Sequence, residues 1–385
     1  MMSMHPVVIL GSHHWDPAAL PLEAFKERLS AVRRQMRLNG WHGLIVHGDA
    51  EQSPMLAWLT NFCPRLRWTL CMVGPEGEPQ LLVAGATRDL PAARQLTWCK
   101  SVESYESLDL LSGWTQQLRR AEAPAEPLRI AVYGMSRIRD AVRETLVQTV
   151  GPEVELCDAE LILDGLMHPK RKYELNVIRQ AHIILAQAVE QLTQAWRGGK
   201  PVCEAVLQAE LCARRAQAHD VRILFSVDGG RTLRPFENID SLCADTLVCY
   251  VAVRYLGYWA ERFVTRGCEG APMYQAAAAI LEGFRQRAAP GITGTDLQQA
   301  AVPHLSGFGW HPMLEGGYGH GIGLVLEERL GLAPDSGDAM QAGGVYSLRA
   351  GLVNTAGEGV LMSATVHLSV DGTLPVLLDA PQAAK

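Results

Sequence analysis

Several side chains capable of acid and base chemistry stand in short glycine-marked segments of the second half of the chain. They are His320 in Gly-His-Gly-Ile-Gly-Leu, Glu327 and Glu328 just after it, Glu261 at the end of Gly-Tyr-x-x-Glu, and Arg349 in Ser-Leu-Arg-Ala-Gly. Carboxylates crowded in a cleft raise one another's pKa and can share a proton with an imidazole. A guanidinium holds a carboxylate through two parallel hydrogen bonds. Together these residue types would suit a reaction on a small, charged, amino-acid-like molecule.

Length, composition and net charge restrict the classes of protein to which this chain can belong. The chain has 385 residues, 48% of them apolar and 20% charged, which predicts two globular domains. A net charge of −6 without a basic stripe predicts no nucleic-acid partner. The nine cysteines form no C-x-x-C pair, so we expect reduced thiols, a cytoplasmic location and no zinc ribbon. Residues 1–11 hold only a short apolar stretch, which predicts neither secretion nor membrane insertion.

The first half alternates helix and strand patterns. Residues 25–39 have helical spacing of apolar residues, and residues 43–47 form a short apolar run. Residues 68–73 and 80–84 flank a Gly-Pro-Glu-Gly turn, which indicates a hairpin, and residues 128–133 suggest another strand. We therefore predict an α/β domain over residues 1–165.

The second half, residues 166–385, begins with helices and continues with strands. Helical patterns cover residues 172–194, 204–217 and 274–287, while strand patterns run from residue 221 to 266 and close the chain at 344–348, 359–368 and 374–378. Helices that flank antiparallel strands predict an α+β domain.

Segments of the second half, taken in order, resemble the creatinase, aminopeptidase P, prolidase and methionine aminopeptidase family. They are MHPKRKYELNVIRQ (167–180), the Gly-Tyr-x-x-Glu segment, APGITGTDL (289–297), GHGIGL (319–324), the Ser-Leu-Arg-Ala-Gly segment and the closing Asp371-Gly372. In the first half, LAWLTNF (56–62) is similar to the family's Y-L-T-G-F strand. The resemblance implies an α/β creatinase-like N-terminal domain, an α+β pita-bread catalytic domain and a homodimer.

The resemblance also implies a changed metal site. The family's hydrolases hold two divalent ions with two Asp, one His and two Glu, and the matching positions here are Tyr250, Glu261, His320, Arg349 and Ser363. An arginine close to two dications would be repelled by several kcal/mol, in order of magnitude. We therefore expect no metal and no other cofactor. Two further family histidines are also replaced, by Phe236 and Glu327.

Creatinase, a metal-free member of this family, provides the nearest functional expectation: hydrolysis of a non-peptide C–N bond in a small substrate that carries a carboxylate. His320 would transfer the proton, and Glu261 would orient His320 or a cationic group of the substrate. Glu327 would serve as the base, and Glu328 is a further catalytic candidate. The expected substrate-binding residues are Arg349, Tyr250 and Phe236, joined by Phe62, Arg65 and Arg67 reaching from the partner copy.

Other interpretations of the same residues stay open. The chain could be an inactive pseudo-peptidase that serves as a binding module, or thirdly a lyase, an isomerase or a conventional metallopeptidase. His320 could be a buried remnant, Glu327 and Glu328 a solvated pair, and Arg349 the partner of Glu261 or Glu328 in a structural ion pair. Tyr250 and Phe236 could merely fill volume, Arg65 and Arg67 could be ordinary surface arginines, and Cys249 suits a small buried hydrophobe.

Overall fold

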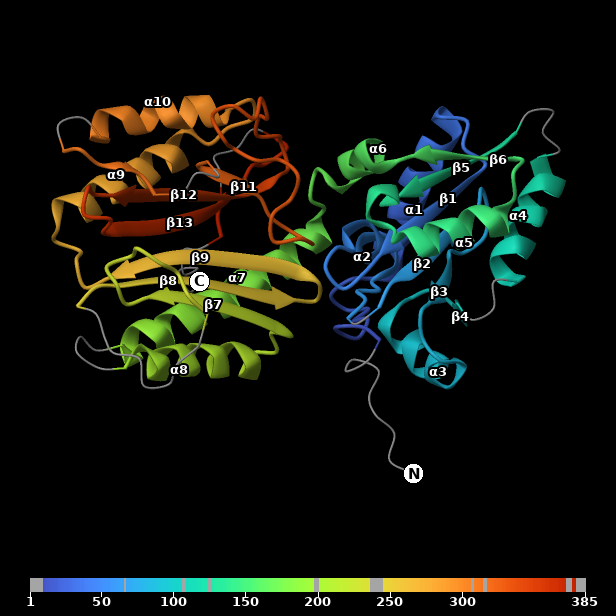
Figure 1. Ribbon diagram of the computed structural model, residues 1–385, viewed down its shortest axis with the longest axis horizontal. Coiled ribbons are helices and arrows are strands. Elements are labelled where there is room, and N and C mark those ends of the chain that lie inside the picture. The colour runs from blue at the N-terminus through green and yellow to red at the C-terminus, as the bar shows by residue number, and fades with distance from the viewer. Residues whose placement is uncertain are drawn as a thin grey trace. The chain divides into compact units, whose positions relative to one another are not determined.

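The computed structural model divides the chain into two compact units, Met1–His168 and Pro169–Lys385. Figure 1 shows both, and each is described by itself. The structure describes residues 10–65, 67–105, 109–122, 127–196, 201–235, 245–305, 308–313, 317–371 and 376–378. Within these ranges, no helix has the length and apolar character that crossing a bilayer requires.

The first unit is built on one mixed sheet, whose described strands run in the order β4-β3-β2-β1-β5-β6. The strands are β1 (Gly43–Gly48), β2 (Thr69–Val73), β3 (Gln80–Val83), β4 (Ser101–Ser104), β5 (Leu128–Tyr133) and β6 (Val154–Asp158). The helices are α1 (Leu22–Leu38), α2 (Pro54–Thr60), α3 (Leu90–Ala93), α4 (Asp109–Glu122), α5 (Asp140–Val150) and α6 (Glu160–Asp164), with 3-10 turns η2 (Thr87–Asp89), η3 (Arg94–Leu96), η4 (Met135–Arg137) and η5 (Gly165–Met167).

Strand alternation in this sheet places apolar side chains against the helices. Ile45 of β1 and Ile130 of β5 pack with Trp114 of α4 and Leu146 of α5 in one core. Residues two apart in a strand share a face, so one face of the sheet is covered by α4 and α5. The α/β class expected for this part of the chain is confirmed.

The described residues of the second unit form two sheets and two pairs of long helices. Its helices are α7 (Lys172–Ala195), α8 (Val202–Arg215), α9 (Pro272–Arg287) and α10 (Gly294–Leu305). Its strands are β7 (Asp220–Ser226), β8 (Leu247–Tyr255), β9 (Tyr258–Arg266), β10 (His311–Pro312), β11 (Gly319–Gly321), β12 (Val345–Val353), β13 (Gly359–His367) and β14 (Val376–Leu377). One sheet has the order β7-β8-β9, and the other β10-β12-β13-β14 with β11 also paired to β12.

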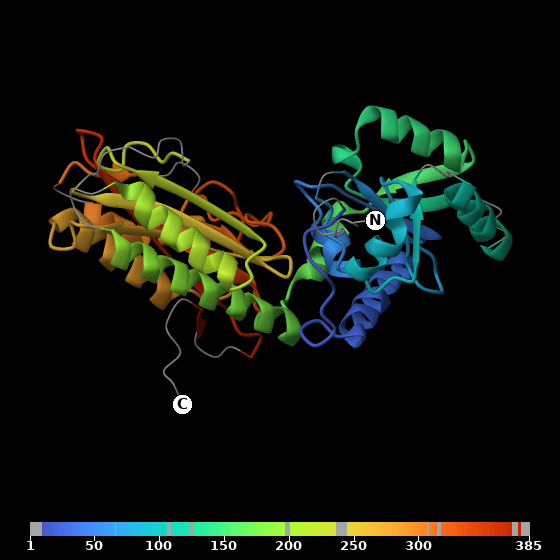
Figure 2. The ribbon, with the colours of Figure 1, turned by 90° about the horizontal axis from the view of Figure 1, so that it is seen from below.

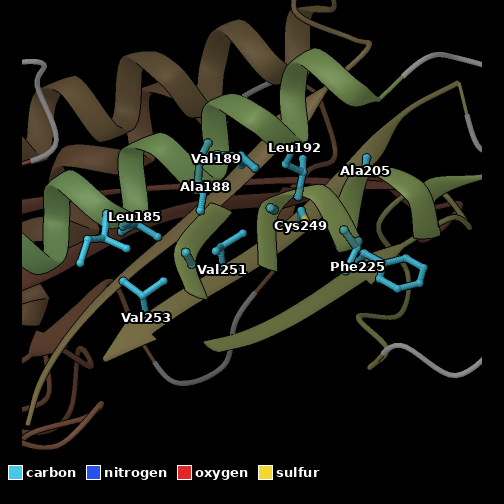
Figure 3. Packing of buried hydrophobic residues seen from close by; sticks show 14 of the residues in the cluster. Leu185, Ala188, Val189, Leu192, Ala205, Phe225, Cys249, Val251 and Val253 are labelled. Carbon is cyan, nitrogen blue, oxygen red and sulfur yellow. The ribbon is translucent and has the colours of Figure 1, made fainter. Parts of the chain in front are cut away.

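Each sheet of the second unit is covered by one helix pair (Figure 1). Helices α7 and α8 lie side by side on the β7-β8-β9 sheet, as Figure 2 shows from below. Their contact face is a core in which Leu185 and Ala188 of α7 meet Val251 and Val253 of β8 (Figure 3). Helices α9 and α10 cover β12 and β13 in the same way, through a second core. These layers match the expected pita-bread architecture.

Side-chain hydroxyls join the two sheets where β9 meets β13. The amide of Phe263 donates to Oγ of Ser363 at 2.9 Å, and Oγ1 of Thr265 donates to the carbonyl of Leu361 at 2.8 Å. All four of these residues are buried. The two strands are therefore held side by side, and the residues on their inner faces are brought together.

Candidate active site

In the β7-β8-β9 sheet of the second unit, the alternation of side chains along each strand separates core residues from site residues. Cys249 and Val251 of β8 face the helix-covered core, so Tyr250 between them faces the other side. On β9, Ala260 and Val264 join the same core, which turns Glu261 and Phe263 the same way as Tyr250. The β8–β9 register confirms this because Tyr250 pairs with Phe263. Tyr250, Glu261 and Phe263 thus share one face.

In the other sheet of the second unit, which contains β11, β12 and β13, the same alternation directs polar side chains away from the covering helices. Leu348 and Ala350 of β12 lie in the core under α9 and α10, so Ser347 and Arg349 project from the opposite face. His320 of β11 pairs with Ser347 across the ladder and therefore projects on that face too. His320 and Arg349 both contact Glu261, as expected.

Glu261 is the centre of the cluster. Its side chain is fully buried. Oε2 accepts a hydrogen bond from the hydroxyl of Tyr250 at 2.8 Å. Oε1 lies 2.9 Å from Nε2 of His320 and accepts from Nη2 of Arg349 at 3.1 Å. A buried carboxylate needs such partners to stay charged, and both of its oxygens have them.

The surroundings of Glu261 fix its charge. Burial by itself raises the pKa of Glu261, but the hydrogen bond from His320 and the charges of His320 and Arg349 outweigh burial and lower the pKa to about 2. Burial, followed by the negative charge of Glu261, raises the pKa of Tyr250 well above its usual range. Glu261 is therefore ionised near neutral pH and Tyr250 is a neutral hydrogen-bond donor.

His320 has a defined orientation because both ring nitrogens are engaged. Nδ1 donates to the carbonyl of Gly321 at 2.8 Å, so this nitrogen carries a proton. Nε2 lies within hydrogen-bond distance of both Arg349 and Glu261. Arg349 can only donate, whereas Glu261 can only accept. A neutral ring therefore satisfies Arg349 and a protonated ring satisfies Glu261.

Arg349 carries the positive charge of the cluster. Its side chain is 12% exposed, and its guanidinium carbon lies 5.4 Å from the centre of the Phe263 ring. On the outer side, Nη2 donates to Oε1 of Glu327 at 3.1 Å, and the side chain of Glu327 is 67% exposed. The interpretation of Arg349 as an ion-pair partner of Glu261 is thus confirmed, and Glu327 is a second partner.

Glu328 has a different environment from Glu327. Its Oε1 lies 2.5 Å from Nζ of Lys170, and the side chains of Lys170 and Glu328 are only 2% and 10% exposed. Gly323 lies against this pair, since a Cβ there would be 2.3 Å from Oε1 of Glu328. The buried pair ties the segment before α7 to the loop that follows β11, the strand of His320. Sequence reasoning missed Lys170, although it stands in the basic patch that opens the 167–180 segment.

The side chains at the family's metal-ligand positions do not fit a pair of divalent cations. Tyr250 is a neutral phenol, Arg349 brings a guanidinium onto Glu261, and the hydroxyl of Ser363 accepts a hydrogen bond from Phe263. Divalent ions of this kind prefer carboxylate and imidazole ligands. In the described part of the chain, no group of three or more His, Cys, Asp or Glu side chains is placed to bind a metal ion.

The remaining expected residues lie outside this cluster. Phe236 falls outside the described residues. Phe62 belongs to the first unit and its ring is fully buried, which argues against the expected reach toward a partner copy. Arg65 and Arg67 are exposed, and Arg67 donates to the carbonyl of Ala84 at 3.1 Å, so their role stays a prediction. Cys249 is fully buried, and burial raises its pKa to about 12, as suits a small buried hydrophobe.

Comparison with known families agrees with this fold. The model of metallopeptidase family M24 matches residues 176–369, which is half of the chain and includes the strands that carry Glu261, His320 and Arg349. The chain belongs to the M24 family. No curated protein sequence matches it.

Solved structures of the same architecture extend the match to both units. Prolidase from Pyrococcus horikoshii OT3 superposes with a TM-score of 0.74 at 15% identity, covering 92% of this chain and 99% of that one. The X-Pro aminopeptidase from Thermotoga maritima MSB8 gives 0.76 at 16% identity, with 92% and 97% covered. The His243Ala form of Escherichia coli aminopeptidase P gives 0.71 at 15% identity, with 94% and 96% covered. At these identities the likeness defines the fold alone.

Proposed function

We propose that this chain is a metal-independent hydrolase of a non-peptide C–N bond in a small amino-acid-like molecule that carries a carboxylate. The contact of Arg349 with both Glu261 and His320 carries the proposal. It supplies a fixed positive charge, built into the chain, at the position where the family's hydrolases hold cations. A guanidinium stays charged at every physiological pH.

In the proposed reaction His320 transfers the proton. Water attacks the carbon of the C–N bond; the water oxygen bonds to that carbon as the C–N bond breaks. One water proton passes through Nε2 of His320 to the leaving nitrogen, and the other stays on the product oxygen. The two neighbours of Nε2 support this role, because Arg349 stabilises the neutral ring and Glu261 stabilises the protonated one. Glu327, at the exposed edge, remains a candidate base.

The roles of the other residues follow from their contacts. Tyr250 and Arg349 orient Glu261, and Arg349 recognises the carboxylate of the substrate. The buried pair of Glu328 with Lys170 supports a role in holding the loop that follows β11 rather than in proton transfer. The proposal includes a cytoplasmic homodimer in which exposed Arg65 and Arg67 serve the partner's site.

The test uses chelator-treated protein whose metal content is checked by elemental analysis. Guanidino, ureido, amidino and N-acyl amino acids are offered, and release of amine or ammonia is followed. The metal-free protein is expected to turn over one of these classes, and His320→Gln to lose at least about a hundredfold in kcat. Turnover that appears only after manganese, cobalt or zinc is added would overturn the proposal.

A second candidate function is a binding module without catalysis. The observation that favours it is the internal pairing of the cluster: Glu261, His320 and Arg349 each have partners within the chain. This candidate predicts that a compound from the same panel raises the unfolding midpoint of the wild-type protein without being consumed. It also predicts that His320→Gln leaves that shift largely intact.

A further inference from the structure

Glu327 and Arg349 form a contact in which one partner is anchored and the other is not. Nη2 of Arg349 donates to Oε1 of Glu327 at 3.1 Å. The side chain of Arg349 is 12% exposed, whereas that of Glu327 is 67% exposed. Glu327 lies in the loop that follows β11 and contacts the guanidinium only from its outer side.

The guanidinium is held in place without Glu327. Oε1 of Glu261 binds Nη2 at 3.1 Å from the inside, and the ring of Phe263 lies 5.4 Å from the guanidinium carbon. Glu261 is fully buried and itself fixed by Tyr250. Loss of Glu327 would therefore leave Arg349 positioned and charged.

Arg349 also has hydrogen-bonding capacity that its neighbours do not use. Its contacts with Glu261, His320 and Glu327 all use Nη2. Nε is buried and has no hydrogen-bond partner among the described residues. The Nε and Nη2 edge of a guanidinium matches the two oxygens of a carboxylate. Glu327 contacts the guanidinium through one oxygen at Nη2, so a ligand carboxylate that engaged both Nη2 and Nε would bind better.

We infer that Glu327 is an internal competitor for a carboxylate subsite at Arg349, and that a ligand carboxylate displaces it. Water competes for the charge of the exposed Glu327 carboxylate, which weakens the pair, so displacing this carboxylate costs little. The negative charge of Glu261 beside the subsite favours a ligand with a single negative charge over a dianion such as phosphate. This inference deepens the proposed function, on which it rests only for the identity of the substrate.

The inference gives Glu327 a role that experiment can separate from that of a general base. A base would leave ligand affinity unchanged when it is neutralised and would lower turnover. An internal competitor, when neutralised, would leave the subsite open and raise ligand affinity. The direction of the affinity change in Glu327→Gln therefore decides between the two.

The experiment is isothermal titration of the full chain with N-acetylglycine, and with N-acetylglycinamide as the uncharged counterpart. Glu282→Gln is the matched control, because Glu282 is a partly exposed acid paired with Arg285 in α9 at 2.6 Å. Glu327→Gln is expected to bind N-acetylglycine about fivefold tighter than wild type, and Glu282→Gln within about twofold of wild type. The amide is expected not to bind.

Arg349→Lys keeps the charge without the fork and is expected to bind at least about tenfold more weakly. Circular dichroism shows whether this variant folds; if it does not, the Glu327→Gln and amide comparisons still decide. Equal or weaker binding by Glu327→Gln, or equal binding of acid and amide, overturns the inference. Tighter binding by Glu327→Gln, with no panel compound hydrolysed by wild type, would sink the proposed hydrolysis and leave this subsite standing.

Discussion

Arg349 and Ser363 lie directly opposite each other in the antiparallel β12–β13 ladder. In the family's metal-binding pattern these two positions carry glutamates. Like charges directly opposite in a sheet destabilise it unless a cation lies between them. With one position cationic and the other neutral, the ladder needs no such cation.

Restoring the acids should restore metal binding. The triple variant Tyr250→Asp, Arg349→Glu, Ser363→Glu places carboxylates at the three replaced positions, which together with Glu261 and His320 completes the family's five ligands. We expect it to bind Mn²⁺ at least about tenfold more tightly than wild type, by titration calorimetry, and to gain thermal stability when Mn²⁺ is added. Arg349→Gln, which removes the repulsion but adds no acid, is the control. A triple variant indifferent to Mn²⁺ would contradict the positional assignment.

Removing the guanidinium should destabilise the second unit. Arg349→Met leaves Glu261 buried without its cation, and breaking such a pair costs about 3–5 kcal/mol. The loss is measured by urea unfolding. The double variant Glu261→Gln, Arg349→Met should recover part of it, because no buried charge remains. Arg285→Met, in the exposed pair with Glu282, is the control and should cost about 1 kcal/mol or less. Equal effects at the two arginines would speak against a buried cluster.

Adding one methyl group at Gly323 should disturb the Lys170–Glu328 pair. A Cβ there would lie 2.3 Å from Oε1 of Glu328 and 3.0 Å from Nζ of Lys170. Both side chains are buried, so neither can swing freely into solvent. We expect Gly323→Ala to lower the free energy of unfolding by about 1–3 kcal/mol. Gly331→Ala, where a Cβ meets nothing within 4 Å, serves as the control.

His367 should make the protein sensitive to mild acid. The residue is 6% exposed, and neither ring nitrogen has a hydrogen-bond partner among the described residues. Burial lowers the pKa of His367, and the charge of Arg179 lowers it further against the opposing effect of Asp371. The unfolded chain therefore binds the proton more readily. The contribution of neutral His367 to stability is therefore fully present above the unfolded pKa of about 6.5, and it is lost as the pH drops toward the lower pKa of the folded state.

His367→Leu removes this titration and the unpaired nitrogens together. The difference between unfolding midpoints at about pH 7.5 and about pH 5 should shrink in this variant relative to wild type. Exposed His311 provides the control, and His311→Gln should leave that difference unchanged. An unchanged difference in His367→Leu would mean that the acid sensitivity arises elsewhere, for instance at His47, whose pKa burial also lowers.

Local patterns predicted most of the long elements. The strand expected at 128–133 matches β5, and the helix expected at 172–194 ends one residue short of α7. These elements have strong periodicity because one face is buried. Helices α4 and α10 were not predicted; α10 contains Pro303, which weakens a helical pattern. Such helices are stabilised by packing against the sheets, which cannot be predicted from the local sequence pattern.

The site was predictable only in part. Glu261, His320 and Arg349 were assigned through motifs, and they meet in the structure. The separation of Glu327 from Glu328 was not predictable, because adjacent residues in a loop have no fixed alternation. One contacts Arg349 at the exposed edge, and the other pairs with Lys170, 158 positions earlier in the chain. Long-range partners of this kind leave no trace in local spacing.

A cation that is a side chain obeys different rules from a dissolved ion. Arg349 is synthesised with every copy of the protein, so its presence beside Glu261 does not vary with the metal supply of the surroundings. Chelators cannot extract it, and no competing ion can take its place. Only a mutation can remove or move this positive charge, so the charge of the site is encoded in the sequence.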